Sequence, residues 1–332
     1  MSRQYDLCGF GNAMVDVLLQ VDEAALAATG LEKGSMQLVE NDFQSGLLSR
    51  LSDGKEVLVP GGSVANSLAV FSQLGGKAAY ASLLGQDRYG EIFSADFAKL
   101  GIAMINAPLA GESSATCVSL IGADAQRTMC TSLAVLKRFC TDHVSAEAIS
   151  ASRWIFIEGY QLANPRGPEA VRKMLKLAKA SDCKVALTLS VTWLASTFRD
   201  TILEMLPQLD LVFANDDEAM ALSGEKSADA AMKWLLARLP GAAVSAGVAG
   251  AWLGWQGQTA FSPAFRCEPV DTTGAGDVFA GAVLYGLSRD LPAEDVVRAA
   301  CYLCTRVILR KGARLDGDVG ALWREGLSAR SA

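Results

Sequence analysis

Hydrophobic residues in the second half of the chain form short runs that alternate with longer amphipathic segments. Trp154-Ile155-Phe156-Ile157 and Leu211-Val212-Phe213-Ala214 are apolar runs typical of buried strands, whereas Pro168 to Ala180 spaces its apolar residues at helical intervals. Strands that alternate with helices predict βαβ units and a parallel sheet. Two long helices, near 276–287 and 293–309, are expected to close the chain.

Two other segments break this pattern. Residues 12–40 and 113–131 carry short segments of β type without intervening long helices. They predict a small separate sheet that is inserted into the main one. The chain has 332 residues and no internal repeat or long linker. We therefore expect one α/β domain over residues 1–332 with a small subdomain formed by 12–40 and 113–131.

Charge and composition narrow the range of partners. The chain carries 30 Lys and Arg against 36 Asp and Glu, a net charge of −6, and it has no basic run. This balance argues against binding to nucleic acid or to a membrane surface. The long uncharged stretch 239–265 contains five glycines and two prolines, so consecutive strands are favoured over a membrane span.

The eight cysteines are scattered, and the N-terminal residues lack the apolar stretch of a signal peptide. We expect a cytoplasmic protein with free thiols, including the pair Cys301 and Cys304. The single histidine, His143, excludes a histidine-rich metal site and a scheme with two catalytic histidines. Any catalysis must rely on carboxylates, backbone dipoles, Lys or Arg, or a cofactor.

The clearest candidate for chemistry is Asp271-Thr272-Thr273-Gly274-Ala275-Gly276-Asp277, which runs directly into an apolar helix. A glycine-rich turn at a helix start leaves unpaired N–H groups that suit a phosphate. Asp277 is placed beside this anion site, where it can accept a proton, and the combination suits phosphoryl transfer. The helix dipole is expected to lower the pKa of Asp277. An ordinary capping aspartate is the alternative on these residues alone.

Two further segments have the same double interpretation. Gly61-Gly62-Ser63-Val64-Ala65-Asn66 places glycines, a hydroxyl and an amide at a helix start, facing a ligand or simply capping the helix. Asn215-Asp216-Asp217-Glu218 follows a predicted strand and can hold hydrated Mg²⁺ or cap the next helix.

Two common nucleotide motifs are not matched. Gly9-Phe10-Gly11 follows a strand, but Met14 stands where a dinucleotide fingerprint has its third glycine, which argues against a dehydrogenase. A Walker A motif is absent from the sequence, which excludes a P-loop site.

Together the two glycine signatures resemble those of the ribokinase-like (PfkB-type) family of carbohydrate and nucleoside kinases. Gly85-Gln86-Asp87-Arg88-Tyr89-Gly90 and Asn215–Glu218 match family segments in the same order. The opening Gly11–Asp16 is similar to that of the adenosine kinase branch. So are Gly34–Val39 in the segment before Gly61, Gln126–Met129 and Ile157–Tyr160. The resemblance implies a doubly wound, mostly parallel sheet flanked by helices, with a small β-sheet lid.

The resemblance also implies roles for individual residues. Asp277 would be the base, with Arg127 and the backbone N–H groups of Gly274, Ala275, Gly276 and Asp277 on the transferred phosphoryl group. The substrate would contact Asn12, Asp16, Gly62, Ser63 and Asn66. ATP would lie near Asn215, Ser245, Gly247, Gly250, Thr272 and Thr273. Asn215 and Glu218 would hold Mg²⁺ through water, and a monovalent cation such as K⁺ would lie near Asp271.

The implied reaction moves the γ-phosphoryl group of Mg-ATP to the 5′-hydroxyl of a nucleoside, with adenosine as the first expectation. Val191-Thr192-Trp193, Ala249 and Gln161 depart from the pattern of the branch. They leave open inosine, guanosine, cytidine, ribose and fructose as acceptors. A nucleoside-binding protein without catalysis is the alternative of another class. The sequence leaves open whether the protein is a monomer or a homodimer.

Overall fold

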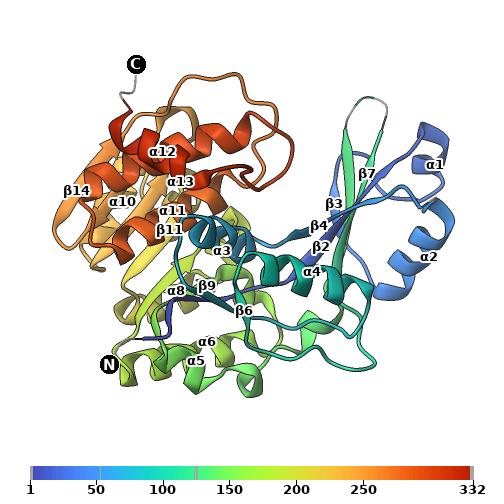
Figure 1. Cartoon of the computed structure of the whole chain (residues 1–332), viewed down its shortest axis with the longest axis horizontal. Coiled ribbons are helices and arrows are strands. Elements are labelled where there is room, and N and C mark those ends of the chain that lie inside the picture. The colour runs from blue at the N-terminus through green and yellow to red at the C-terminus, as the bar shows by residue number, and fades with distance from the viewer. Residues whose placement is uncertain (1–2, 53, 123, 125, 330–332) are drawn as a thin grey trace.

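The computed structural model of the protein describes residues 3–52, 54–122, 124 and 126–329. Its strands form two separate sheets (Figure 1). The large sheet runs in the order β14 (Gln258–Ser262), β13 (Ala251–Trp255), β12 (Gly241–Ser245), β11 (Leu211–Asn215), β10 (Lys184–Thr188), β9 (Ser152–Glu158), β1 (Tyr5–Phe10), β5 (Ala78–Ala81) and β6 (Ala103–Met104).

The large sheet is mostly parallel, as the sequence predicted. Strands from β6 to β12 pair in parallel, and β13 and β14 add an antiparallel hairpin at one edge. The hairpin is joined by Gln256 and Gly257, both with positive φ, a loop far too short for a crossover helix.

Helices cover both faces of this sheet, so its central strands are buried on both sides. Trp154 and Phe156 of β9 face one apolar cluster, whereas Ile155 and Ile157 face the other. The first face is covered by α3 (Ser63–Gln73), α4 (Arg88–Lys99), α11 (Ala275–Ser288), α12 (Ala293–Ile308) and α13 (Val319–Ser328). The second is covered by α5 (Ala146–Ser150), α6 (Gly167–Ala180), α7 (Thr192–Thr197), α8 (Arg199–Met205), α9 (Asp216–Ser223) and α10 (Ala228–Leu236).

Short 3₁₀ helices lie in the connections: η1 (Ala134–Arg138), η2 (Thr141–His143), η3 (Gly159–Ala163), η4 (Leu206–Gln208) and η5 (Gly247–Ala249). Two helices were predicted to close the chain, but the structure has a third, α13. Asp318 caps its start, and the Asp318 side chain accepts a 2.8 Å hydrogen bond from the N–H of Ala321. Its apolar positions Val319 and Trp323 are one helical turn apart, and both are buried.

The small sheet lies to one side of the large one (Figure 1). Its strands are β3 (Met36–Leu38), β8 (Arg127–Ser132), β7 (Ala115–Ile121), β2 (Met14–Gln20) and β4 (Val57–Gly61), in that order. The helices α1 (Glu23–Ala27) and α2 (Asn41–Leu51) bury Leu26 and Leu47 against Val17 and Val118 of this sheet.

The two segments assigned to the lid, 12–40 and 113–131, contribute to β2, β3, β7 and β8, whereas β4 lies outside both. Residues 123 and 125 of the second segment lie outside the described residues. The lid as a separate unit with these boundaries remains a prediction. Among the described helices, none combines the length and the apolar character needed to cross a membrane.

Candidate active site

Polar residues gather where the parallel strands of the large sheet end. Asn12 follows β1, whereas Glu158, Thr188, Asn215 and Ser245 are the last residues of β9, β10, β11 and β12. In open α/β sheets this edge is where ligands bind. The starts of α3 and α11 complete the site, since these helices pack closely enough for a side-chain carbon at Gly281 to lie 2.3 Å from the carbonyl oxygen of Ser67.

Asp277 lies in the first turn of α11, directly after the glycine-rich turn. Gly274 adopts the left-handed conformation, with φ 81°, and a side-chain carbon there would lie 2.4 Å from the carbonyl oxygen of Ala313. Glycine is therefore required at this position. The first helical bond runs from the N–H of Val278 to the carbonyl of Gly274, so the N–H groups of Gly276 and Asp277 have no partner within the helix.

The turn differs in one detail from the predicted anion site. The N–H of Ala275 donates a 3.3 Å hydrogen bond to the carbonyl oxygen of Thr272. This leaves Gly276 and Asp277 as the better-placed donors for a phosphate. A side-chain carbon at Gly276 would meet no atom within 4 Å, and Gly276 lines the pocket beside Asp277.

The carboxylate of Asp277 is held by two side chains of α3. The hydroxyl of Ser63 donates a 2.6 Å hydrogen bond to Oδ1, and Nδ2 of Asn66 donates a 2.9 Å bond to Oδ2. The two glycine signatures therefore meet at one carboxylate. This contact joins residues that are more than 200 positions apart in the chain.

The electrostatics of Asp277 differ from the sequence expectation. Burial of the carboxylate raises its pKa, and the hydrogen bonds from Ser63 and Asn66 together with the charge of Arg314 offset only part of this effect. The predicted lowering of the pKa was wrong because loss of solvent outweighs these favourable contacts. A raised pKa makes Asp277 a stronger base than the sequence indicated.

A pocket of about 230 Å³ opens beside Asp277. Its wall combines Ser63, which was predicted to contact the substrate, with Asn215 and Ser245, which were predicted to lie near ATP. The polar lining residues are Ser63, Thr188, Ser190, Asn215, Glu218, Ser245 and Asp277, and the others include Gly276, Phe213 and Phe279. Thr188 and Ser190 were not predicted from the sequence.

Asn12, which follows β1, lies against Gly62, which directly precedes α3. The N–H of Asn12 donates to Oε2 of Glu158 at 3.1 Å, and its side-chain oxygen accepts a 2.9 Å bond from Gln161. Gly62 has φ 105°, and a side-chain carbon there would lie 2.1 Å from the carbonyl oxygen of Asn12. The turn after β1 and the start of α3 are thus in direct contact.

Asp16 comes to the site from the small sheet. It lies on β2, and a side-chain carbon at Gly61 would approach its Oδ2 to 2.7 Å. Burial raises the pKa of Asp16 to about 6, while the positive charges of Arg127 and Arg314 act in the opposite direction. Asp16 is therefore mainly ionised at neutral pH and can accept hydrogen bonds from hydroxyl groups.

Arg127 reaches from β8 to the core, where its Nη2 lies 3.1 Å from Oδ2 of Asp271. Asp271 also accepts hydrogen bonds from the N–H and hydroxyl of Thr273 and from the N–H of Gly312. Although partial burial acts in the opposite direction, these donors and Arg127 lower the pKa of Asp271 to about 2. Arg127 is thus near the anion turn but is paired with its first residue.

These contacts bear on the monovalent cation that the resemblance implied near Asp271. A carboxylate offers about four lone-pair positions, and four donors already occupy this one. A cation bound to this carboxylate would have to replace one of these donors. As they are arranged, the residues present do not fit a cation bound to this carboxylate.

Asn215 and Glu218 form a reciprocal cap at the start of α9. The side chain of Asn215 accepts from the N–H of Glu218 at 2.8 Å, and Oε2 of Glu218 accepts from the N–H of Asn215 at 3.1 Å. Burial raises the pKa of Glu218. Both residues also line the pocket, so capping and a role toward Mg²⁺ are compatible.

The donor set fits Mg²⁺ held through water rather than directly. Both oxygens of Glu218 already accept hydrogen bonds from Asn215. Among the described residues, no group of three or more His, Cys, Asp or Glu is arranged to hold a metal ion. Mg²⁺ keeps several of its waters in nucleotide complexes, which suits this arrangement.

The residues assigned to the ATP side lie around the same edge. Ser245 lines the pocket, while Gly247 and Gly250, with φ 51° and 121°, turn the chain between β12 and β13. Thr272 and Thr273 are exposed at the glycine-rich turn. Of these residues, Ser245 and Asn215 share the pocket with Asp277.

Two charged residues of the site escaped the sequence analysis as individual residues. Glu158, only 2% exposed, accepts from the N–H groups of Asn12 and Val64, and burial raises its pKa to about 7. Its signal was an acid at the end of a buried apolar strand. Arg314 donates from Nε to Oδ1 of Asn66 at 3.0 Å. No pattern around residue 314 marks this arginine in the sequence, because its position depends on contacts with distant segments.

The chain is similar in sequence and in fold to known proteins. Residues 42–318 match the model of the pfkB family carbohydrate kinases. The chain is 26% identical to adenosine kinase 2 of Arabidopsis thaliana, over 94% of this chain and 96% of the relative. Among solved structures, it is similar to adenosine kinase from Sinorhizobium meliloti, with 31% identity, a TM-score of 0.85 and coverage of 97% and 99% of the two chains. A probable sugar kinase from Rhizobium etli has 29% identity, a TM-score of 0.86 and coverage of 98% and 99%.

Proposed function

The chain belongs to the pfkB family of carbohydrate kinases, and from this membership and the geometry of the site we propose that it phosphorylates the 5′-hydroxyl of adenosine with ATP. As a family member it is an ATP-dependent nucleoside or sugar kinase, as the two glycine signatures predicted. Adenosine is the proposed acceptor because full-length relatives are adenosine kinases.

One observation carries the proposed chemistry. A hydroxyl, that of Ser63, donates a 2.6 Å hydrogen bond to the carboxylate of Asp277, next to the open N–H groups of the glycine-rich turn. This contact supports the idea that a substrate hydroxyl can donate to the same carboxylate. Phosphoryl transfer to an alcohol needs this combination of a proton acceptor and an anion site within reach of each other.

On the acceptor side, Asp16 and Asn66 would hold the ribose hydroxyls. Asp16 offers a carboxylate from the small sheet, and Asn66 keeps one N–H and one lone pair beyond its bonds to Asp277 and Arg314. Asn12, Gly62 and Ser63 would form the floor beneath the sugar. The small sheet would act as a lid that excludes water, which otherwise competes as an acceptor.

On the phosphate side, the N–H groups of Gly276 and Asp277 would receive the γ-phosphoryl oxygens, with Gly274 and Ala275 shaping the turn. Arg127 would exchange Asp271 for the phosphoryl group and offset its charge. Ser245, Gly247, Gly250, Thr272 and Thr273 would line the ATP side. Mg²⁺ would enter with ATP, neutralise charge on its phosphates, and be oriented through water by Asn215 and Glu218.

The step conserves atoms and charge in a simple way. The 5′-oxygen forms a bond to the γ-phosphorus while the bond from that phosphorus to the β,γ-bridging oxygen breaks. The proton of the hydroxyl passes to Asp277, and ADP leaves with the electron pair of the broken bond. Asp277 then releases its proton to solvent.

A sugar is the second candidate acceptor, because the relative from Rhizobium etli is described as a probable sugar kinase. Inosine, guanosine and cytidine stay open within the nucleoside class. A binding protein without catalysis is disfavoured, because Asp277 and the glycine-rich turn are both present and in contact.

The proposed setting is the cytoplasm, which is supported by eight free cysteines. A monomer and a homodimer both remain open. The test is ADP release from Mg-ATP with adenosine, inosine, guanosine, cytidine, ribose and fructose in parallel. The proposal expects the highest kcat/KM with adenosine. Turnover confined to another acceptor overturns adenosine, and no turnover with any acceptor overturns the kinase.

A further inference from the structure

The loop after α12 touches the active site at three consecutive residues. The N–H of Gly312 donates to Oδ2 of Asp271 at 3.0 Å. Ala313 packs so closely on the glycine-rich turn that only glycine fits at position 274. The next residue, Arg314, turns toward α3. Nothing in the proposed roles above uses this loop.

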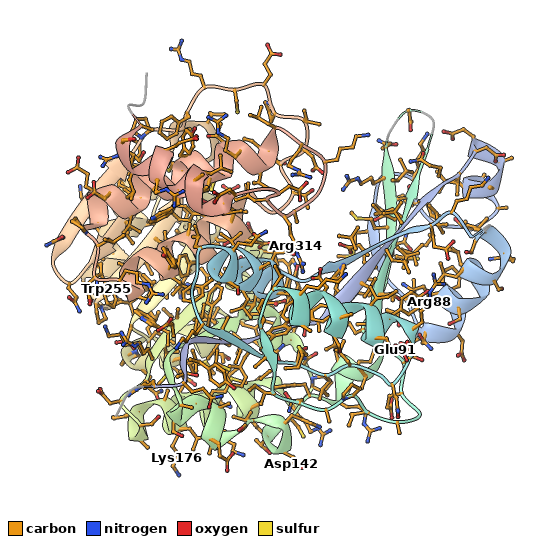
Figure 2. All side chains as sticks on the ribbon, viewed as in Figure 1. Arg88, Glu91, Asp142, Lys176, Trp255 and Arg314 are labelled. Atoms are coloured by element: carbon orange, nitrogen blue, oxygen red, sulfur yellow. The ribbon has the colours of Figure 1, made fainter. Side chains whose placement is uncertain are left out.

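Arg314 lies between the core and the small sheet (Figure 2) and is only 16% exposed. Its Nε donates to Oδ1 of Asn66 at 3.0 Å, and its Nη1 is paired with Asp96 of α4. The guanidinium group lies 5.9 Å from the ring centre of Phe97. The carboxylate of Asp96 and the ring of Phe97 thus hold the guanidinium group, while its Nε donates to Asn66.

The contact continues through Asn66 to Asp277. Oδ1 of Asn66 accepts from Arg314, and Nδ2 of the same amide donates to Asp277 at 2.9 Å. Arginine has only donors and an ionised carboxylate has only acceptors. The amide between them can therefore satisfy both neighbours in one orientation only. Without Arg314, a rotated amide would present its oxygen to the carboxylate.

The charge of Arg314 also acts on the site. It lowers the pKa of both Asp16 and Asp277, against the larger opposing effect of burial. Its Nη2 is buried without an acceptor among the described residues. An unsatisfied buried donor lowers stability, so stability alone is a poor explanation for an arginine here.

We propose that Arg314 is a positioning residue for phosphoryl transfer, acting through Asn66 to hold the carboxylate of Asp277 in the orientation that accepts the proton of the substrate hydroxyl. This inference rests on the proposed function, because it needs Asp277 as the base. It adds a fixed chain of contacts from Asp96 through Arg314 and Asn66 to that base.

Three variants separate the hydrogen bond from the charge. Arg314→Met removes both, Arg314→Gln keeps a donor for Asn66 without the charge, and Arg314→Lys keeps the charge. Arg298→Lys is the matched control, because Arg298 is a similarly shielded arginine that is ion-paired with Asp295 on the surface of α12, away from the site. Thermal unfolding of each variant shows whether it folds.

The readout is kcat as a function of pH with Mg-ATP and the best acceptor. The titratable and charged groups around Asp277 are Glu158 from β9, Glu218 from α9, and Arg314; Ser63 and Asn66 of α3 do not titrate. Removal of the positive charge raises the pKa of Asp277. The acid limb of the kcat–pH profile should therefore move to higher pH by about half a unit or more in Arg314→Met and Arg314→Gln. The Lys variant keeps the limb of the native protein.

We expect kcat to fall at least about tenfold in Arg314→Met and by a smaller factor in Arg314→Gln. The control Arg298→Lys should keep the kcat of the native protein. An unchanged kcat and acid limb in both Met and Gln overturns the proposal, as does an equal loss in all three variants with no movement of the limb. If Arg314→Met does not fold, Arg314→Gln and Arg314→Lys decide on the same criteria.

A measurement without turnover keeps the two proposals distinguishable. The pKa of the Asp277 carboxyl is followed by ¹³C NMR and assigned by its loss in Asp277→Asn. A higher pKa in Arg314→Gln supports the role of Arg314, and an unchanged pKa overturns it. A native protein that phosphorylates no acceptor overturns the proposed function whatever the NMR result.

Discussion

Arg127 of the small sheet and Asp271 of the large domain form an ion pair, with 3.1 Å between Nη2 and Oδ2. The pair connects β8 of the small sheet to the first residue of the glycine-rich turn. Asp271 is well shielded, whereas the side chain of Arg127 is 34% exposed. A partly exposed guanidinium group next to an anion site can exchange a carboxylate for a phosphoryl group.

This relationship gives the first prediction. Arg127→Gln is expected to lower kcat by about 10²-fold, because one donor to the developing charge is lost. Stability should change by less than about 1 kcal/mol, since the pair is not fully buried. Steady-state kinetics with Mg-ATP and thermal unfolding measure the two effects. Arg138→Gln, at an ion pair with Glu112 away from the site, is the control. A kcat of Arg127→Gln equal to that of the control contradicts this role.

Two glycines of the same turn should respond differently to alanine. The backbone at Gly274 has positive φ, which alanine rarely adopts, and the new side-chain carbon would collide with Ala313. Gly274→Ala should therefore lose about 1–3 kcal/mol of stability. At Gly276 the space is open, so Gly276→Ala should fold normally and instead raise KM for ATP or lower kcat. Chemical denaturation and kinetics of the pair separate the effects. Equal loss of stability in both variants would show that the turn is different from this description.

Glu158 predicts a pH-dependent stability. Burial raises its pKa from 4.5 to about 7 in the folded protein, so between these pH values the folded state holds more protons than the unfolded chain. The free energy of unfolding should therefore fall as pH rises through this window, by an amount on the order of 3 kcal/mol at most. Glu158→Gln should flatten the curve. Urea unfolding between pH 4.5 and 7.5 tests this, and parallel curves for both proteins would refute it.

The acids at the start of α9 predict a difference in magnesium dependence. Glu218→Gln should raise the Mg²⁺ concentration needed for half-maximal activity several-fold, because Glu218 is buried and lines the pocket. Asp217→Asn, an exposed neighbour in the same turn, should leave the requirement unchanged. Titration of Mg²⁺ at fixed ATP measures both. The same shift in both variants would indicate a general effect of negative charge.

Local structure could be predicted from the sequence where one segment carries all the information. The glycine-rich turn that opens α11 and the alternation of apolar strands with helices are local features, and the structure contains both. The anion-binding role of the turn stays a prediction. The meeting of Ser63 with Asp277 was predictable only as two separate helix starts, because their contact depends on how α3 packs on α11.

The residues that were missed depend on contacts between distant segments. Arg314 gains its position from Asp96 and Phe97 of α4, which no pattern around residue 314 announces. The pKa of Asp277 was predicted in the wrong direction for the same reason. The helix dipole is visible in a sequence, but the burial that outweighs it arises only when the pieces assemble.

The most direct test of the account is the formation of AMP and ADP from adenosine and Mg-ATP by the native protein and by Asp277→Asn. Equal amounts of AMP and ADP are expected with the native protein. For Asp277→Asn we expect a kcat about 10²–10⁴-fold lower, with little change in thermal unfolding. A variant that keeps kcat within a factor of about two, or a native protein that forms no AMP, would contradict the account.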